Sequence, residues 1–139
     1  MRILAIDPGE KNIGVAISDP TGTIANPFTV LKHVSRTEDA AAIVEIASHN
    51  EVDLIVIGQA LSGEGTPTPQ SRRAARLAGA IKSQTTIRVC LWDESGSTQT
   101  ARAARIAMGA TRRKRKGHLD ELAATVILQD YLDHGAESG

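Results

Sequence analysis

The sequence predicts an α/β fold with a mixed five-stranded sheet, in which three antiparallel strands precede βαβ units and helices cover both faces. Three observations predict it. The chain opens with three strand-like segments separated by turns, its hydrophobic period then changes from two to about 3.6, and two later apolar segments alternate with helical ones. A length of 139 residues suits one compact domain, which we expect to span 1–139.

The first three strands are expected at residues 2–7, 13–18 and 23–31, the third with a bend near Pro27. Apolar residues alternate in these segments, as they do in half-buried strands. Turn residues separate them, Asp-Pro-Gly at 7–9 and Asp-Pro-Thr-Gly at 19–22. The opening is therefore predicted to be an antiparallel meander.

Helix-capping residues mark the next elements. Ser35 and Glu38 have the spacing of a capping box, and Thr68 precedes Pro69, a residue favoured at the first position of a helix. The second helix presents an apolar face of Ala74, Leu77, Ala78 and Ile81. Short apolar strands, of the type found in parallel sheets, are expected at 54–57 and 87–92.

The rest of the chain is predicted to contain loops and two further helices. A glycine-containing loop is expected at 58–67 and a helix from Ser97 or Thr98 to about 109. A flexible basic loop at 111–117 then leads to a last amphipathic helix, and 134–139 is expected to be a disordered tail. The RNase H-like fold has this order of elements.

Three acidic residues far apart in the sequence are expected to meet at one end of the sheet. Asp7 ends the first strand, Glu94 follows the fifth, and Asp120 lies in the expected first turn of the last helix. Taken singly, each has an ordinary explanation as a turn, cap or helix-dipole residue. Converging carboxylates repel each other, and a divalent cation removes that penalty. We therefore expect Asp7, Glu94 and Asp120 to bind Mg²⁺ or Mn²⁺ and to be catalytic in phosphodiester hydrolysis.

The charges are unevenly distributed although the formal net charge is zero. Between residues 65 and 119 the chain carries most of its 16 Lys and Arg residues and only two acids, Asp93 and Glu94. Such asymmetry predicts a positive face that attracts nucleic acid. The residues expected to bind nucleic acid are Lys11, Arg72, Arg73, Arg112, Arg113, Lys114, Arg115 and Lys116.

The composition also predicts a location. A single cysteine, Cys90, has no partner for an internal disulfide and is expected to be a buried hydrophobe in a strand. The chain has no apolar run of membrane-spanning length, and its start is strand-like rather than a signal peptide. We therefore expect a cytoplasmic protein with no membrane partner.

Several motifs, in order along nearly the whole chain, resemble the YqgF (RuvX) family. They are Ile6-Asp7-Pro8-Gly9, Asn12-Ile13-Gly14-Val15-Ala16-Ile17-Ser18-Asp19, Ala25-Asn26-Pro27, Leu91-Trp92-Asp93-Glu94 with Ser97-Thr98, the basic loop, and Leu119-Asp120 with the helix that follows. The resemblance implies an RNase H-like fold related to RuvC resolvases and a metal-dependent endonuclease acting on structured nucleic acid. The usual assignment of the family is maturation of the 5′ end of pre-16S rRNA in ribosome biogenesis.

In that family, the acidic positions correspond to Asp7, Glu94 and Asp120, and the resemblance implies that Asp93 supports these ligands rather than being one of them. Two segments depart from the family pattern. Ser95-Gly96 stands where the family has an arginine after Asp-Glu, and Gly58-Gln59-Ala60 stands where it has Gly-Leu-Pro. Both departures concern substrate positioning, and all three acids are present.

Other functions stay open at this point. The same chemistry suits a Holliday junction resolvase in DNA recombination, for which a homodimer rather than a monomer is expected. The departure at Ser95-Gly96 allows a nucleic-acid-binding factor without catalysis. A sugar-kinase or actin-like ATPase shares the Asp-Pro-Gly hairpin but needs two such domains, and this chain has room for one.

Overall fold

The computed structural model describes residues 1–59, 66–93 and 116–135. The elements follow in the order β1 (Ile3–Pro8), β2 (Asn12–Ser18), β3 (Ala25–Lys32), α1 (Arg36–His49), β4 (Leu54–Gln59), α2 (Pro69–Lys82), β5 (Arg88–Asp93), α4 (Lys116–Asp130) and the short π-helix η1 (Tyr131–Gly135). The five strands form one sheet in the order β3-β2-β1-β4-β5. β2 is antiparallel to β1 and β3, whereas β1, β4 and β5 are parallel. The predicted mixed sheet is confirmed.

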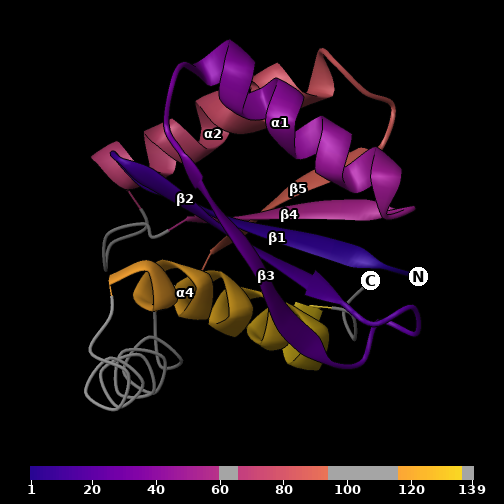
Figure 1. The fold of residues 1–139 in the computed structure, drawn as a ribbon. Coiled ribbons are helices and arrows are strands. Elements are labelled where there is room, and N and C mark those ends of the chain that lie inside the picture. The colour runs from indigo at the N-terminus through magenta and orange to yellow at the C-terminus, as the bar shows by residue number, and fades with distance from the viewer. Residues whose placement is uncertain (60–65, 94–115, 136–139) are drawn as a thin grey trace.

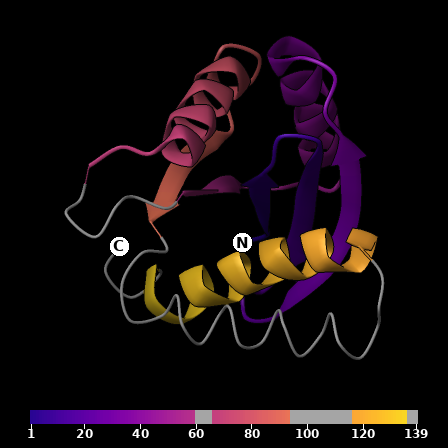
Figure 2. The same ribbon diagram turned by 90° about the vertical axis from the view of Figure 1, so that its left-hand side faces the viewer.

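Helices cover both faces of the sheet. Figure 1 shows α1 and α2 on one face and α4 on the other, and Figure 2 shows the same layers from the side. The alternation of β1 divides the core between these faces. Leu4 and Ile6 pack with α1 and α2, while Ile3 and Ala5 pack with α4. Within the described ranges, no helix is long and apolar enough to cross a membrane.

Local sequence signals fix the starts of α1 and α2. The Oγ of Ser35 accepts a hydrogen bond from the backbone N–H of Glu38 at 3.2 Å, as the capping spacing predicts. At α2 the box is reciprocal: Thr68 Oγ1 accepts from Ser71 N at 3.1 Å, and Ser71 Oγ accepts from Thr68 N at 2.8 Å. The four apolar residues predicted for this helix are all buried.

The third strand differs from its predicted start. It begins at Ala25 because the preceding residues form a turn around Asp19, whose carboxylate accepts the backbone N–H groups of Thr23 and Ile24 at 2.8 and 2.9 Å. The bend expected near Pro27 coincides with a shift in the β2–β3 register. Val15 pairs with Thr29 whereas Ala16 pairs with Pro27, so one residue of β3 is left over.

The predicted loop boundaries were wrong at two places. Gly58 and Gln59 extend β4, because both pair with β5. Lys116 and Gly117 belong to α4, so Asp120 lies one turn beyond the first residue of this helix rather than in its first turn. The rest of the predicted loops, at 60–65 and 111–115, the helix predicted at 97–109 and residues 136–139 lie outside the described part of the chain.

The expected disordered tail was wrong for His134 and Gly135, which belong to η1. Long-range contacts hold this turn. Trp92 Nε1 donates to Asp130 Oδ2 at 2.8 Å, and the Trp92 ring meets that of Tyr131 edge to face, with centroids 5.4 Å apart. Gly135 is buried against these two rings, where a Cβ atom would lie 2.5 Å from Tyr131.

Candidate active site at the end of the central strand

Asp7 lies near the C-terminal end of β1, the central strand. Since Ala5 packs on the α4 side and Ile6 on the opposite side, alternation places Asp7 on the α4 face, where it is half-buried. Gly14 of β2 pairs directly with it. The β1–β4 register, in which Ile6 pairs with Ile57, brings Gly58 alongside on the other strand. Both residues that flank Asp7 across the sheet are therefore glycines.

The same level of the sheet continues into β5. Gly58 pairs with Trp92, which packs into the core on the α4 face. The next residue, Asp93, pairs with Gln59 and by alternation belongs to the opposite face. Asp93 is thus not on the face of Asp7. Glu94, the expected ligand from this strand, lies outside the described residues.

The third expected ligand is carried by α4. The backbone of Asp120 is helical, and the described side chains of α4 begin after it. Figure 1 shows that α4 starts toward the side of the sheet where β1 and β5 end. No group of three acidic, His or Cys side chains suited to a metal occurs among the described residues. Since Glu94 and the side chain of Asp120 are not among them, the convergence of the three carboxylates stays a prediction.

Cys90 lies two residues before Trp92 on β5. It is half-buried against the α4-side core, as a small hydrophobe would be. Burial raises the pKa of its thiol above the ordinary value. The thiol is therefore protonated and poorly nucleophilic near neutral pH.

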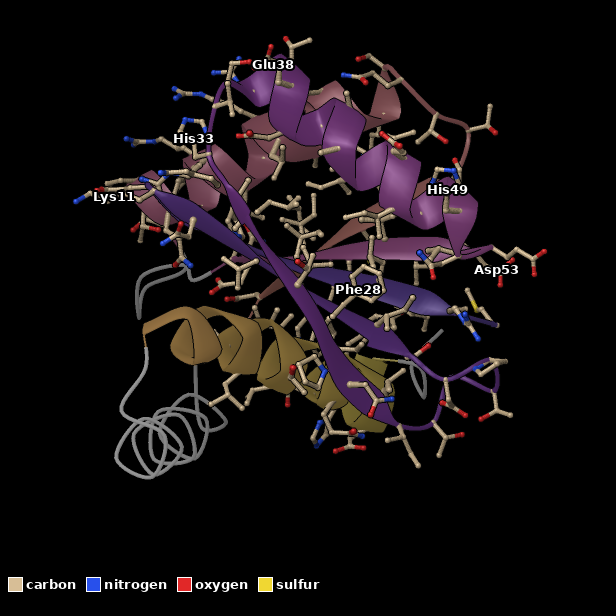
Figure 3. All side chains as sticks on the ribbon, in the orientation of Figure 1. Lys11, Phe28, His33, Glu38, His49 and Asp53 are labelled. Atoms are coloured by element: carbon tan, nitrogen blue, oxygen red, sulfur yellow. The ribbon has the colours of Figure 1, made fainter. Side chains whose placement is uncertain are left out.

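The basic residues expected to bind nucleic acid are divided among several places. Lys11 is exposed in the β1–β2 turn, and its carbonyl oxygen accepts the backbone N–H of His33 at 2.8 Å. Figure 3 shows the Lys11 and His33 side chains at the same end of the molecule. Arg112, Arg113, Lys114 and Arg115 lie outside the described residues, and Lys116 is described only as the first residue of α4.

Arg72 and Arg73 lie in the first turns of α2 and line a cleft of about 460 Å³ on the α1–α2 face. Arg36 of α1 and Arg76 of α2 line the same cleft and were not among the predicted site residues. The sequence carried a signal for Arg76, which follows Arg72 and Arg73 at four and three residues and so shares their helix face. Only the packing of α1 beside α2 reveals the position of Arg36.

The sheet order, the helices on both faces and the acidic residue at the end of β1 define an RNase H-like protein. Solved structures share this fold at low sequence identity. They include Thermus thermophilus RuvC in complex with a Holliday junction substrate (TM-score 0.63, 14% identity, 97% of this chain and 96% of the other). The fowlpox virus Holliday junction resolvase gives a TM-score of 0.56 at 18% identity, covering 96% and 98% of the two chains.

Sequence comparison identifies the family. The RuvX profile, described as a Holliday junction resolvase, matches residues 1–134. A protein of Thermoanaerobacter pseudethanolicus named "Putative pre-16S rRNA nuclease" is 41% identical over 134 residues, covering 96% of both chains. A Clostridium botulinum protein of the same name is 41% identical over 133 residues, covering 96% of this chain and 97% of the other. The chain belongs to the RuvX family.

Proposed function

We propose that this chain is a metal-dependent endonuclease that cleaves phosphodiester bonds in structured nucleic acid and matures the 5′ end of pre-16S rRNA in the cytoplasm. One observation carries the proposal: the half-buried Asp7 stands on the central strand between two glycines. With a glycine on each flanking strand, this position has room beside the carboxylate for a cation and a phosphate. The names of the relatives support the choice of RNA.

The proposed ligands are Asp7, Glu94 and Asp120. Carboxylate oxygens are hard ligands, which Mg²⁺ and Mn²⁺ prefer, and the glycines beside Asp7 leave room for the waters that Mg²⁺ retains. When bound, such cations activate water and stabilise the leaving oxygen of a phosphodiester. Lys11, Arg72, Arg73 and the basic residues 112–116 are proposed to hold the nucleic-acid backbone through its phosphates.

A second candidate is the resolution of Holliday junctions. It is favoured by the description of the family and by the fold shared with junction resolvases. A four-way junction has two-fold symmetry, so a resolvase is expected to act as a homodimer. Sedimentation velocity on the purified chain separates the cases, because a monomer favours RNA processing.

The proposal is tested with the Asp7→Asn variant. Wild type and variant are incubated with pre-16S rRNA and with a four-way DNA junction, in Mg²⁺, in Mn²⁺ and in EDTA. We expect wild type to cleave the RNA only with a divalent cation, and Asp7→Asn to lose this cleavage while keeping its circular dichroism spectrum. Glu45→Gln is the matched control, because Glu45 is exposed on α1. Cleavage by Asp7→Asn at the wild-type rate would contradict the proposal, and binding without cleavage in either metal would favour a non-catalytic factor.

A further inference from the structure

The cleft on the α1–α2 face is separate from the Asp7 side of the sheet. Its walls are the first turns of α1 and α2, and its floor includes Pro8 and Ile13 at the ends of β1 and β2. Pro8 follows Asp7 directly and, by alternation, belongs to the opposite face. The cleft and the candidate active site therefore lie on opposite faces of the sheet, at the end where β1 terminates.

Arginines dominate the charge of this cleft. Arg36 of α1 and Arg72 and Arg76 of α2 are exposed and line the cleft. Within the described residues, no carboxylate forms an ion pair with any of these three arginines. The guanidinium group presents a planar fork of N–H donors that matches a phosphate. Both helices also direct the positive ends of their dipoles toward the cleft, because its walls are their N-terminal turns.

The two acids of the cleft do not cancel this charge. Asp39 is 5% exposed and is already engaged, because its carboxylate accepts the backbone N–H of Val34 at 3.0 Å and contacts His33 Nδ1. Glu10 is 81% exposed, and its ion pair with Arg73 is long, at 3.5 Å. An incoming phosphate displaces such an exposed pair at little cost. The cleft is therefore suited to an anion.

The chemistry of the lining selects the part of the ligand that is bound. Among the described residues, no tryptophan, tyrosine or phenylalanine lines the cleft, and guanidinium groups provide most of its polar surface. Guanidinium groups above an apolar floor recognise phosphate without reading sequence. A volume of about 460 Å³ admits a segment of sugar-phosphate backbone.

We propose that the α1–α2 cleft, through Arg36, Arg72 and Arg76, is a second binding site for the phosphate backbone of the nucleic-acid substrate. A strand cut at Asp7 then continues over the edge of the sheet into this cleft. The site rests on the proposed function for its substrate, but its binding role needs neither metal nor cleavage. Arg36 and Arg76 are the new assignments, and they lie on the two helices that form the walls of the cleft.

The test measures binding in EDTA, so that metal-dependent cleavage does not enter. The cleft variant combines Arg36→Gln, Arg72→Gln and Arg76→Gln. A matched variant combines Arg2→Gln, Lys82→Gln and Arg88→Gln, which removes the same charge around the opposite edge of the sheet, where β1 and β5 begin. Fluorescence anisotropy with a labelled single-stranded RNA of mixed sequence gives the affinity at several salt concentrations, and thermal melting checks that all variants fold.

We expect the cleft variant to bind about ten-fold more weakly than wild type. The negative slope of log affinity against log salt should become shallower by about 0.7 for each phosphate the cleft holds, and the matched variant should change much less. Equal affinities and slopes for the two variants would overturn the proposal. The proposal would also be overturned if the cleft binds only free phosphate. In that case inorganic phosphate would raise the melting temperature of wild type but not of the cleft variant, while the two would bind RNA with equal affinity.

The outcome is independent of the nuclease assay. If wild type cleaves no substrate but the cleft variant still loses RNA affinity, the proposed reaction fails and the binding site stands. If wild type cleaves and the cleft variant binds RNA as wild type does, the binding site fails and the reaction stands.

Discussion

The contact between Trp92 and Asp130 joins the strand that precedes Glu94 to the helix that carries Asp120. Replacing Trp92 by phenylalanine keeps an aromatic ring against Tyr131 but removes the N–H that donates to Asp130 at 2.8 Å. The Asp130 side chain is only 11% exposed, so water does not freely replace the lost donor. The substitution therefore leaves a mostly buried carboxylate short of one hydrogen bond.

The size of the effect follows from these contacts. A hydrogen bond to a charged group contributes about 1.5–3 kcal/mol. The remaining partner, His134, lies 3.2 Å from Asp130 Oδ1 and is 60% exposed, so it compensates little. We expect Trp92→Phe to lower the free energy of unfolding by about 1.5–3 kcal/mol, measured by urea denaturation followed by circular dichroism, with an unchanged m-value.

A double-mutant cycle decides whether the hydrogen bond is the cause. Trp92→Phe, Asp130→Ala and the double variant are compared with wild type, so that the lost His134 contact cancels. We expect a coupling free energy of about 1 kcal/mol or more. A coupling near zero, with the two single effects simply additive, would refute the reasoning and attribute the loss to the smaller ring.

Two further predictions concern a pair of glycines and the turn at Asp19. Gly9→Ala should lower the melting temperature, because the new Cβ would lie 2.3 Å from the carbonyl oxygen of Asn12. Gly79→Ala has nothing within 4 Å of its new Cβ and should stabilise α2 by up to about 1 kcal/mol. A higher melting temperature for Gly9→Ala than for Gly79→Ala would contradict this. Hydrogen bonds, first from the Ile24 N–H, hold the pKa of Asp19 well below its ordinary value of 3.8. The stability lost in Asp19→Asn should therefore be largest above that pH and should decrease as the pH falls below it. A stability difference that does not change with pH in melting curves would exclude this effect.

Much of the fold was predictable because its signals are local. Ser35 and Thr68 begin helices through hydrogen bonds to residues three positions later, so their sequence spacing is enough to place them. Asp7 was likewise predictable, since Asp-Pro-Gly marks the end of the first apolar strand. The order of strands and helices along the chain followed from the change of hydrophobic period.

The features that were missed depend on contacts between distant segments. The register of β1 against β4 sets Gly58 beside Asp7, and no local pattern encodes this register. Arg36 joins Arg76 in the cleft only because α1 packs beside α2. His134 and Gly135 have the composition of a tail, yet Gly135 packs against the Trp92–Tyr131 pair and His134 lies 3.2 Å from Asp130 Oδ1.

The aromatic residues of the core give the protein a spectroscopic asymmetry. The single tryptophan and the single tyrosine touch each other on the α4 face, whereas the core beneath α1 and α2 is aliphatic. Trp92 stands two strands from Asp7 at the same level, a lateral separation of about 10 Å. Intrinsic fluorescence is therefore placed to report binding beside that carboxylate rather than in the arginine cleft behind the sheet, without any added label.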